Sequence, residues 1–173
     1  MTSRVLVISG ASGTGKSTLA EALLEFTTAG WIGVEADLSA PQAATSVDFS
    51  DREVQQRYAE TLLNSVLAWP AAGYDTIIDG LLPYPVSSHH RDVLDRLGSY
   101  DLKILAVTAS ETAIRHRIER RGRGDIEWSL QQLKDIHDGV RADFTLDTTS
   151  INLHDTAPLH EVLTWMNSPH SSS

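Results

Sequence analysis

The chain lacks cysteine and is poor in positive charge. With no cysteine among 173 residues, disulfide frameworks and thiolate metal sites are excluded. Lysine and arginine together number 14 against 23 aspartates and glutamates, so the formal net charge is −9. This balance disfavours general nucleic-acid binding, because neutralising phosphates requires a basic surface. The apolar residues, 41% of the total, are enough for one buried core.

Long apolar runs are also missing. No stretch approaches the roughly 18 consecutive apolar residues of a membrane-spanning helix, and the first residues lack the pattern of a secretory signal. We therefore expect no membrane partner, no nucleic-acid partner and the cytoplasm as the default location. The sequence is compatible with a monomer or a homodimer.

One motif near the start of the chain is specific. Residues 10–17 read GASGTGKS, which fits the P-loop pattern Gly-x4-Gly-Lys-Ser/Thr. An apolar run at 5–8 leads into the motif, and apolar residues at helical spacing follow it. Glycines let successive N–H groups converge on a phosphate, and the helix N-terminus adds a partial positive charge. We expect ATP to bind through Gly10, Ala11, Ser12, Gly13, Thr14, Gly15, Lys16, Ser17 and Thr18.

Two side chains of the motif have predicted chemical roles. Lys16 would reach the β- and γ-phosphates as a catalytic residue, and the Ser17 hydroxyl would ligate Mg²⁺.

Strand-like and helix-like patterns alternate along the chain, which predicts one domain over residues 1–168 and a disordered tail at 169–173. Pro70 and Gly73 are expected to end the second helix. Alternation of this kind indicates a doubly wound parallel sheet with helices on both faces. The predicted strands are 4–9, 31–35, 76–79, 102–108 and 144–146, and the predicted helices are 15–27, 51–69, 88–97, 111–121, 127–140 and one from 155 or 156.

Acidic residues follow two of these strands. Ligands of such sheets lie at the carboxyl ends of the strands, which draws attention to Glu35, Asp37 and Asp79. Asp37 is the predicted catalytic acid that orients or deprotonates an acceptor hydroxyl, with Glu35 as the alternative. Asp79 ends an apolar strand and is predicted to support the Mg²⁺, with hydrogen bonding to the Gly80 turn as the alternative.

Positive charge gathers in one short stretch. Five of the eleven arginines lie within 115–123, where Gly122 and Gly124 interrupt a helical pattern. Planar guanidinium groups suit phosphate oxygens. A lid around 117–127 is predicted to close over the nucleotide, with Arg117 and Arg121 as catalytic residues and Arg123 as a further nucleotide contact. The alternative is a solvated helix face paired with acidic residues.

With these motifs in order, the chain resembles the small P-loop kinases related to nucleoside monophosphate kinases. In its motifs and their order it is similar to gluconate, shikimate and adenylylsulfate kinases and to the chloramphenicol phosphotransferase-like proteins. The resemblance is tight at 10–17 and 117–124 and loose elsewhere. It implies a three-layer αβα fold with a five-stranded parallel sheet of order 2-3-1-4-5. It also implies an ATP-dependent, Mg²⁺-requiring transfer of the γ-phosphoryl group to a hydroxyl of a small molecule.

A regulatory ATPase or GTPase switch without a small-molecule acceptor is the alternative. A GTPase needs an Asn/Thr-Lys-x-Asp motif to specify guanine. Neither Lys103 nor Lys134 lies in that pattern. The acceptor itself is not specified by any motif.

Overall fold

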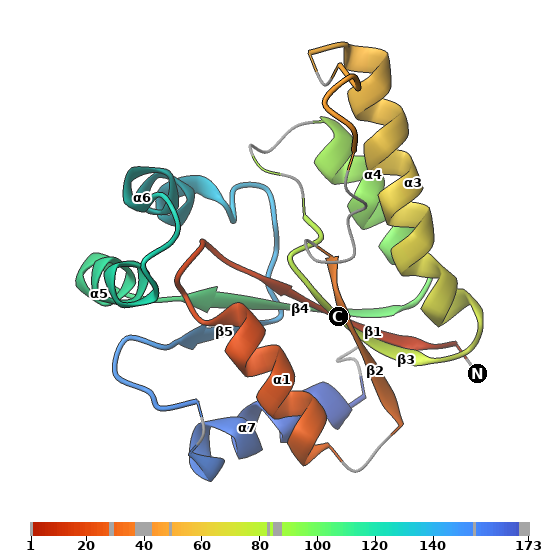
Figure 1. Ribbon diagram of the computed structural model, residues 1–173. Helices are drawn as coiled ribbons and strands as arrows, with labels where there is room; N and C mark the ends of the chain where they lie inside the picture. Colours follow the sequence, from red (N-terminus) through yellow and green to blue (C-terminus); the bar gives the residue numbers. More distant parts are fainter. Residues whose placement is uncertain are drawn as a thin grey trace.

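In the computed structural model, strands and helices alternate as the sequence predicts (Figure 1). The structure describes residues 2–27, 30–36, 43–48, 50–82, 84, 88–153 and 155–169. Its strands are β1 (Arg4–Ser9), β2 (Trp31–Glu35), β3 (Asp75–Asp79), β4 (Asp101–Thr108) and β5 (Phe144–Asp147). Its helices are α1 (Lys16–Phe26), α3 (Arg52–Ala71), α4 (Ser88–Leu97), α5 (Glu111–Arg121), α6 (Ile126–Asp135) and α7 (Thr156–Asn167).

The strands form one parallel sheet in the order β2-β3-β1-β4-β5, which confirms the predicted fold. β1 lies at the centre, paired with β3 on one side and β4 on the other. The register aligns Ile8 with Asp79, and Asp79 in turn with Glu35. Because the strands are parallel, the ends of β1, β2 and β3 meet at one edge of the sheet.

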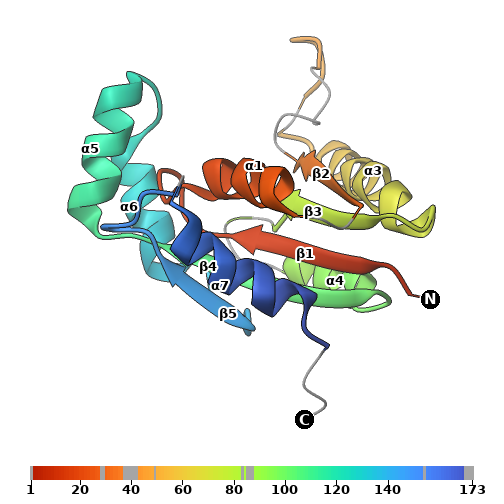
Figure 2. The same cartoon turned by 90° about the horizontal axis from the view of Figure 1, so that it is seen from below.

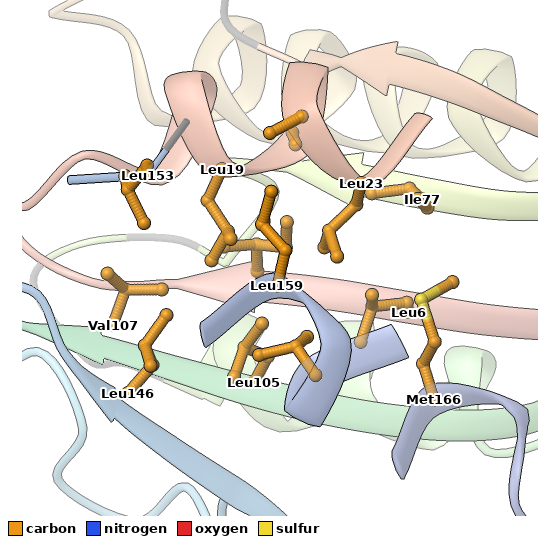
Figure 3. Close-up of a cluster of buried hydrophobic side chains, with 14 residues drawn as sticks. Leu6, Leu19, Leu23, Ile77, Leu105, Val107, Leu146, Leu153, Leu159 and Met166 are labelled. Carbon is orange, nitrogen blue, oxygen red and sulfur yellow. The ribbon is translucent and has the colours of Figure 1, made fainter. Parts of the chain in front are cut away.

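Alternate residues of β1 face two different cores. Leu6 and Ile8 pack with α1 and α7, whereas Val5 and Val7 pack with α3 and α4. This follows from the two-residue period of a strand, and both faces are apolar because helices cover both. Figure 3 shows the first core, in which Leu6 of β1, Leu23 of α1 and the α7 residues Leu159 and Met166 belong to one apolar cluster.

Helices α5 and α6 lie together at the end of the sheet toward which β1 points (Figure 2). They share a small apolar cluster of Ile114, Ile118 and Leu130. Ser110 caps α5 and Asp125 caps α6 through hydrogen bonds to backbone N–H groups. Between the helices, Gly122 takes a left-handed conformation with φ of 63°. Gly122 and Gly124, which the sequence predicts to interrupt the helix, therefore lie in a short turn between α5 and α6.

Two predicted helix ends are wrong. Helix α3 continues through Pro70 to Ala71, two residues beyond the predicted end. A proline in the last turn removes one N–H group, and the chain reverses only at Gly73 with φ of 95°. Helix α6 ends at Asp135, five residues before the predicted Val140. Ile136, directly after the helix, is buried, and residues 136–139 form turns.

Lys103 shows how the last helix is held. It lies on β4 with only 7% of its surface exposed. Its ammonium group donates to the carbonyl oxygens of Trp165 at 2.7 Å and Ser168 at 2.5 Å. A helix leaves its last carbonyl groups without partners, and a cation there is favourable.

Within the described residues, no helix has both the length and the apolar character needed to cross a membrane.

Candidate functional site

The loop between β1 and α1 has the shape of a phosphate cradle. Gly13 and Gly15 have φ of +85° and +96°, conformations that favour glycine. The buried Thr14 hydroxyl donates to the Ala11 carbonyl at 2.8 Å and braces the turn. At Gly10 a Cβ atom would lie 2.2 Å from the Val107 carbonyl oxygen of β4, so the loop requires glycine there. Backbone conformation thus explains the glycines at 13 and 15, and the close approach of β4 explains the glycine at 10.

Three polar side chains meet beside this cradle. The Lys16 ammonium donates to the Ala11 carbonyl at 3.1 Å, across the loop. The Ser17 hydroxyl donates to Asp79 Oδ2 at 2.6 Å and joins α1 to the end of β3. Asp79 is 5% exposed, and its other oxygen, Oδ1, is buried without a hydrogen-bond partner in the described structure. A buried carboxylate oxygen without a donor is unfavourable unless a ligand binds it.

These groups fit a magnesium ion. Mg²⁺ binds oxygen and is usually held by one or two protein groups, with substrate phosphates and water completing its six ligands. Ser17 Oγ and Asp79 Oδ1 supply that kind of donor next to the cradle. The described residues hold no cluster of three or more histidine or acidic side chains that could bind a metal ion by themselves.

A cavity of about 600 Å³ opens over the cradle. One side of it is the P-loop with Lys16, Ser17 and Asp79. The other side is formed by α3, the start of α4 and the segment after β3. Glu35 also lines it, next to Asp79 in the sheet register. Asp37, the predicted catalytic acid, lies outside the described residues.

The three predicted lid arginines take different positions. Arg121 lines the cavity, whereas Arg123 is exposed and is not part of the cavity wall. The Arg117 guanidinium donates to the carbonyl oxygens of Gly13 at 3.2 Å and Thr14 at 3.3 Å. It also donates to the Thr148 carbonyl at 2.6 Å, beyond the end of β5. In this structure Arg117 contacts the carbonyl side of the P-loop, and only Arg121 contributes to the cavity.

Burial and the positive charge of Arg120 lower the pKa of Arg117, an effect that Asp147 partly offsets. The group stays protonated nonetheless, because an arginine does not lose its proton in proteins. Its hydrogen bonds to the P-loop and to Thr148 are therefore bonds from a cation, which are stronger than neutral ones.

Helix α6 supplies site residues that the sequence analysis missed. Trp128 and Gln132, four residues apart on one face of α6, line the cavity together with Ile136 directly after the helix. The Trp128 ring meets the Tyr84 ring edge-on, with 5.1 Å between centroids. Gln132 Oε1 accepts a hydrogen bond from the Ser12 N–H at 3.0 Å. The four-residue spacing was the only available signal, because nothing in the sequence says what this face packs against.

His137, just after α6, lies close to the P-loop. Burial lowers its pKa below the ordinary value of 6.5; a hydrogen bond to the Ser9 carbonyl opposes this shift, and the positive charge of Lys16 adds to it. Its Nε2 is buried without a hydrogen-bond partner in the described structure. The folded protein therefore favours neutral His137.

We expect this histidine to make the protein acid-sensitive. As the pH falls below about 6.5, the unfolded chain takes up a proton that folded His137 resists, so the free energy of unfolding decreases. His137→Gln should therefore lose less stability than the wild type between pH 7.5 and pH 5.5, as measured by denaturant unfolding. His116→Gln, on the exposed face of α5, serves as the control and should follow the wild type. Equal losses in the wild type and His137→Gln would contradict the assignment.

A P-loop in a 2-3-1-4-5 parallel sheet, with a lysine and a serine–aspartate pair beside it, defines a P-loop phosphotransferase. The chain belongs to the chloramphenicol phosphotransferase-like protein family, whose model matches residues 3–163. A comparison with curated protein sequences found no match.

Solved structures share the fold. A sugar kinase from Janibacter sp. HTCC2649, in unliganded form, is 22% identical, with 95% of each chain covered and a TM-score of 0.64. A gluconokinase from Sinorhizobium meliloti 1021 is 19% identical, with 95% of this chain and 92% of that chain covered and a TM-score of 0.61. The APS kinase of Mycobacterium tuberculosis, in complex with AMPPNP and APS, is 14% identical, with 96% and 99% covered and a TM-score of 0.62. At these identities the likeness extends to the fold alone.

Proposed function

We propose that the protein transfers the γ-phosphoryl group of ATP to a hydroxyl of a small molecule. The observation that carries this proposal is the Ser17–Asp79 pair, whose buried Oδ1 accepts no hydrogen bond in the described structure, beside Lys16 at the floor of the cavity. A cavity of about 600 Å³ has the size of a small-molecule site. The family description, which names a phosphotransferase of chloramphenicol, supports a small-molecule acceptor as well.

The chemistry requires positioning and charge stabilisation. The acceptor oxygen forms a bond to the γ-phosphorus while the bond from that phosphorus to the β–γ bridging oxygen breaks, and ADP leaves. The acceptor proton passes to a carboxylate at or just after the end of β2, which we assign to Asp37 with Glu35 as the alternative. Lys16 and Arg121, both on the cavity wall, stabilise the charge of the moving phosphoryl group. Mg²⁺, held by Ser17 and Asp79, would neutralise charge on the β- and γ-phosphates.

The far side of the cavity indicates the character of the acceptor. Tyr58 and Leu62 of α3 line it, together with Val93 of α4 and Leu82 after β3. A wall of this kind gains free energy by covering apolar surface. Among the described residues of α3, α4 and the segment after β3 that line it, none is a lysine or arginine, and His89 is the one histidine. We infer an uncharged alcohol with a substantial apolar body.

The test is a screen of acceptors for ADP release, run with ATP and with GTP. Apolar alcohols are expected to stimulate release above the water background, and sugar acids are not. With an active acceptor, Asp37→Asn should retain nucleotide binding and lose transfer, whereas Glu35→Gln should affect transfer less. Full transfer by Asp37→Asn would refute the role of Asp37, and strong preference for GTP without any acceptor effect would favour a regulatory switch.

A further inference from the structure

Gln132 reaches from α6 into the P-loop. Its Oε1 accepts from the Ser12 N–H at 3.0 Å, across 120 residues of sequence. The same side chain lines the cavity that holds Lys16 and Arg121.

The partner of this bond fixes the orientation of the side-chain amide. A backbone N–H can only donate, so the arm of Gln132 that faces Ser12 must be the oxygen. The other arm is Nε2, which carries two N–H donors. The amide is therefore anchored through its acceptor, and its two donors have no partner among the described residues.

The helix that carries Gln132 is held on several sides. Asp125 caps its first turn, and the buried Ser129 hydroxyl donates to the Asp125 carbonyl at 2.7 Å. Leu130 packs into the cluster shared with α5, and Trp128 packs against Tyr84. Because these contacts fix the helix, the amide has little freedom, and a positioned donor costs little to reorganise during reaction.

The position along the loop indicates which phosphate the donors would meet. The loop N–H groups near the helix hold the α- and β-phosphates, and the P-loop lysine reaches the β- and γ-phosphates. Ser12 lies at the opposite end of the loop from α1, five residues before Ser17. Trp128, one turn before Gln132 on the same face of α6, contacts Tyr84 of the segment after β3, which belongs to the far side of the cavity. We therefore expect the γ-phosphate of a bound nucleotide to lie in the part of the cavity beside Gln132.

We propose that Gln132, anchored on Ser12 through Oε1, donates from Nε2 to the γ-phosphoryl group and makes the site prefer ATP over ADP. This inference rests on the proposed function, because it presupposes that the P-loop binds the triphosphate.

The test compares the binding of Mg²⁺–AMPPNP and Mg²⁺–ADP by calorimetric titration. Gln132→Met keeps the length of the side chain and removes all its hydrogen-bonding groups. ADP affinity should stay within about twofold, and AMPPNP affinity should fall about ten- to a hundredfold, the loss expected for a hydrogen bond to a charged group. Gln56→Met is the matched control, on the exposed face of α3, and should bind both ligands like the wild type.

Gln132→Glu separates the proposed contact from a purely structural role. A glutamate still accepts from the Ser12 N–H but has no donor for phosphate and adds a negative charge. We expect it to retain the wild-type melting temperature and ADP binding, and to weaken AMPPNP at least as much as Gln132→Met does. This variant also keeps the test decisive if Gln132→Met fails to fold.

Two outcomes would overturn the inference alone, provided that the wild type binds both nucleotides. One is an equal loss for AMPPNP and ADP in Gln132→Met, because Gln132 would then only hold the loop. The other is a wild-type ratio of affinities in Gln132→Glu. A wild type that binds neither nucleotide would overturn the proposed function and, with it, this inference.

Discussion

Lys16→Ala is expected to reduce phosphoryl transfer by about a hundred- to a thousandfold, the usual cost of one donor aimed at transition-state charge. The Lys16 ammonium lies across the P-loop, bonded to the Ala11 carbonyl, at the floor of the cavity. In the variant, this cation would no longer stabilise the negative charge that develops on the moving phosphoryl group. ADP release with an active acceptor measures the effect.

Lys134→Ala is the matched control for this prediction, because Lys134 is exposed on α6 and is not on the cavity wall. It should retain wild-type turnover. The melting temperature of Lys16→Ala should stay close to that of the wild type, since Lys16 is only part-buried. A Lys16→Ala enzyme with more than a tenth of wild-type turnover would contradict the assigned role.

Asp79→Asn is expected to abolish most turnover and to raise the Mg²⁺ concentration needed for half-maximal activity at least about tenfold, because an amide has no charge to attract the cation. The variant should nevertheless be as stable as the wild type or more so. It keeps an acceptor for the Ser17 hydroxyl and removes a buried negative charge whose Oδ1 has no hydrogen-bond partner in the described structure. Mg²⁺ titration of activity and thermal unfolding without ligand measure the two effects.

A loss of activity together with unchanged or higher stability is the result expected when the replaced residue binds a ligand. If Asp79 were only a structural partner of Ser17, its replacement would lower the melting temperature and leave the Mg²⁺ dependence unchanged. That result would remove Asp79 from the metal site. Ser17→Ala gives a useful comparison, because it deletes the second predicted ligand and the hydrogen bond at once.

Local patterns predicted the sheet and the cradle well. The P-loop is recognisable because phosphate binding needs glycines, a lysine and a hydroxyl within eight consecutive residues. Asp79 was identified because parallel strands bring their carboxyl ends to one edge. Helix ends were less predictable: α3 passes through Pro70, and α6 stops early so that buried Ile136 can pack.

Contacts between distant segments could not be predicted from sequence. Arg117 shares the arginine stretch with Arg121, yet its guanidinium reaches the loop carbonyls, since the direction of a side chain depends on how α5 packs. Gln132 had no signal at all, because its bond to Ser12 depends on where the turn after Arg121 places α6. The role of Asp37 stays a prediction.

A crystal structure with AMPPNP and Mg²⁺ tests the central claim most directly. We expect the β-phosphate within the N–H groups of the P-loop, Mg²⁺ on Ser17 Oγ with Asp79 beside it, and the γ-phosphate facing the cavity. Crystals in which the nucleotide binds elsewhere, or in which the cradle holds no phosphate at saturating AMPPNP, would contradict the account.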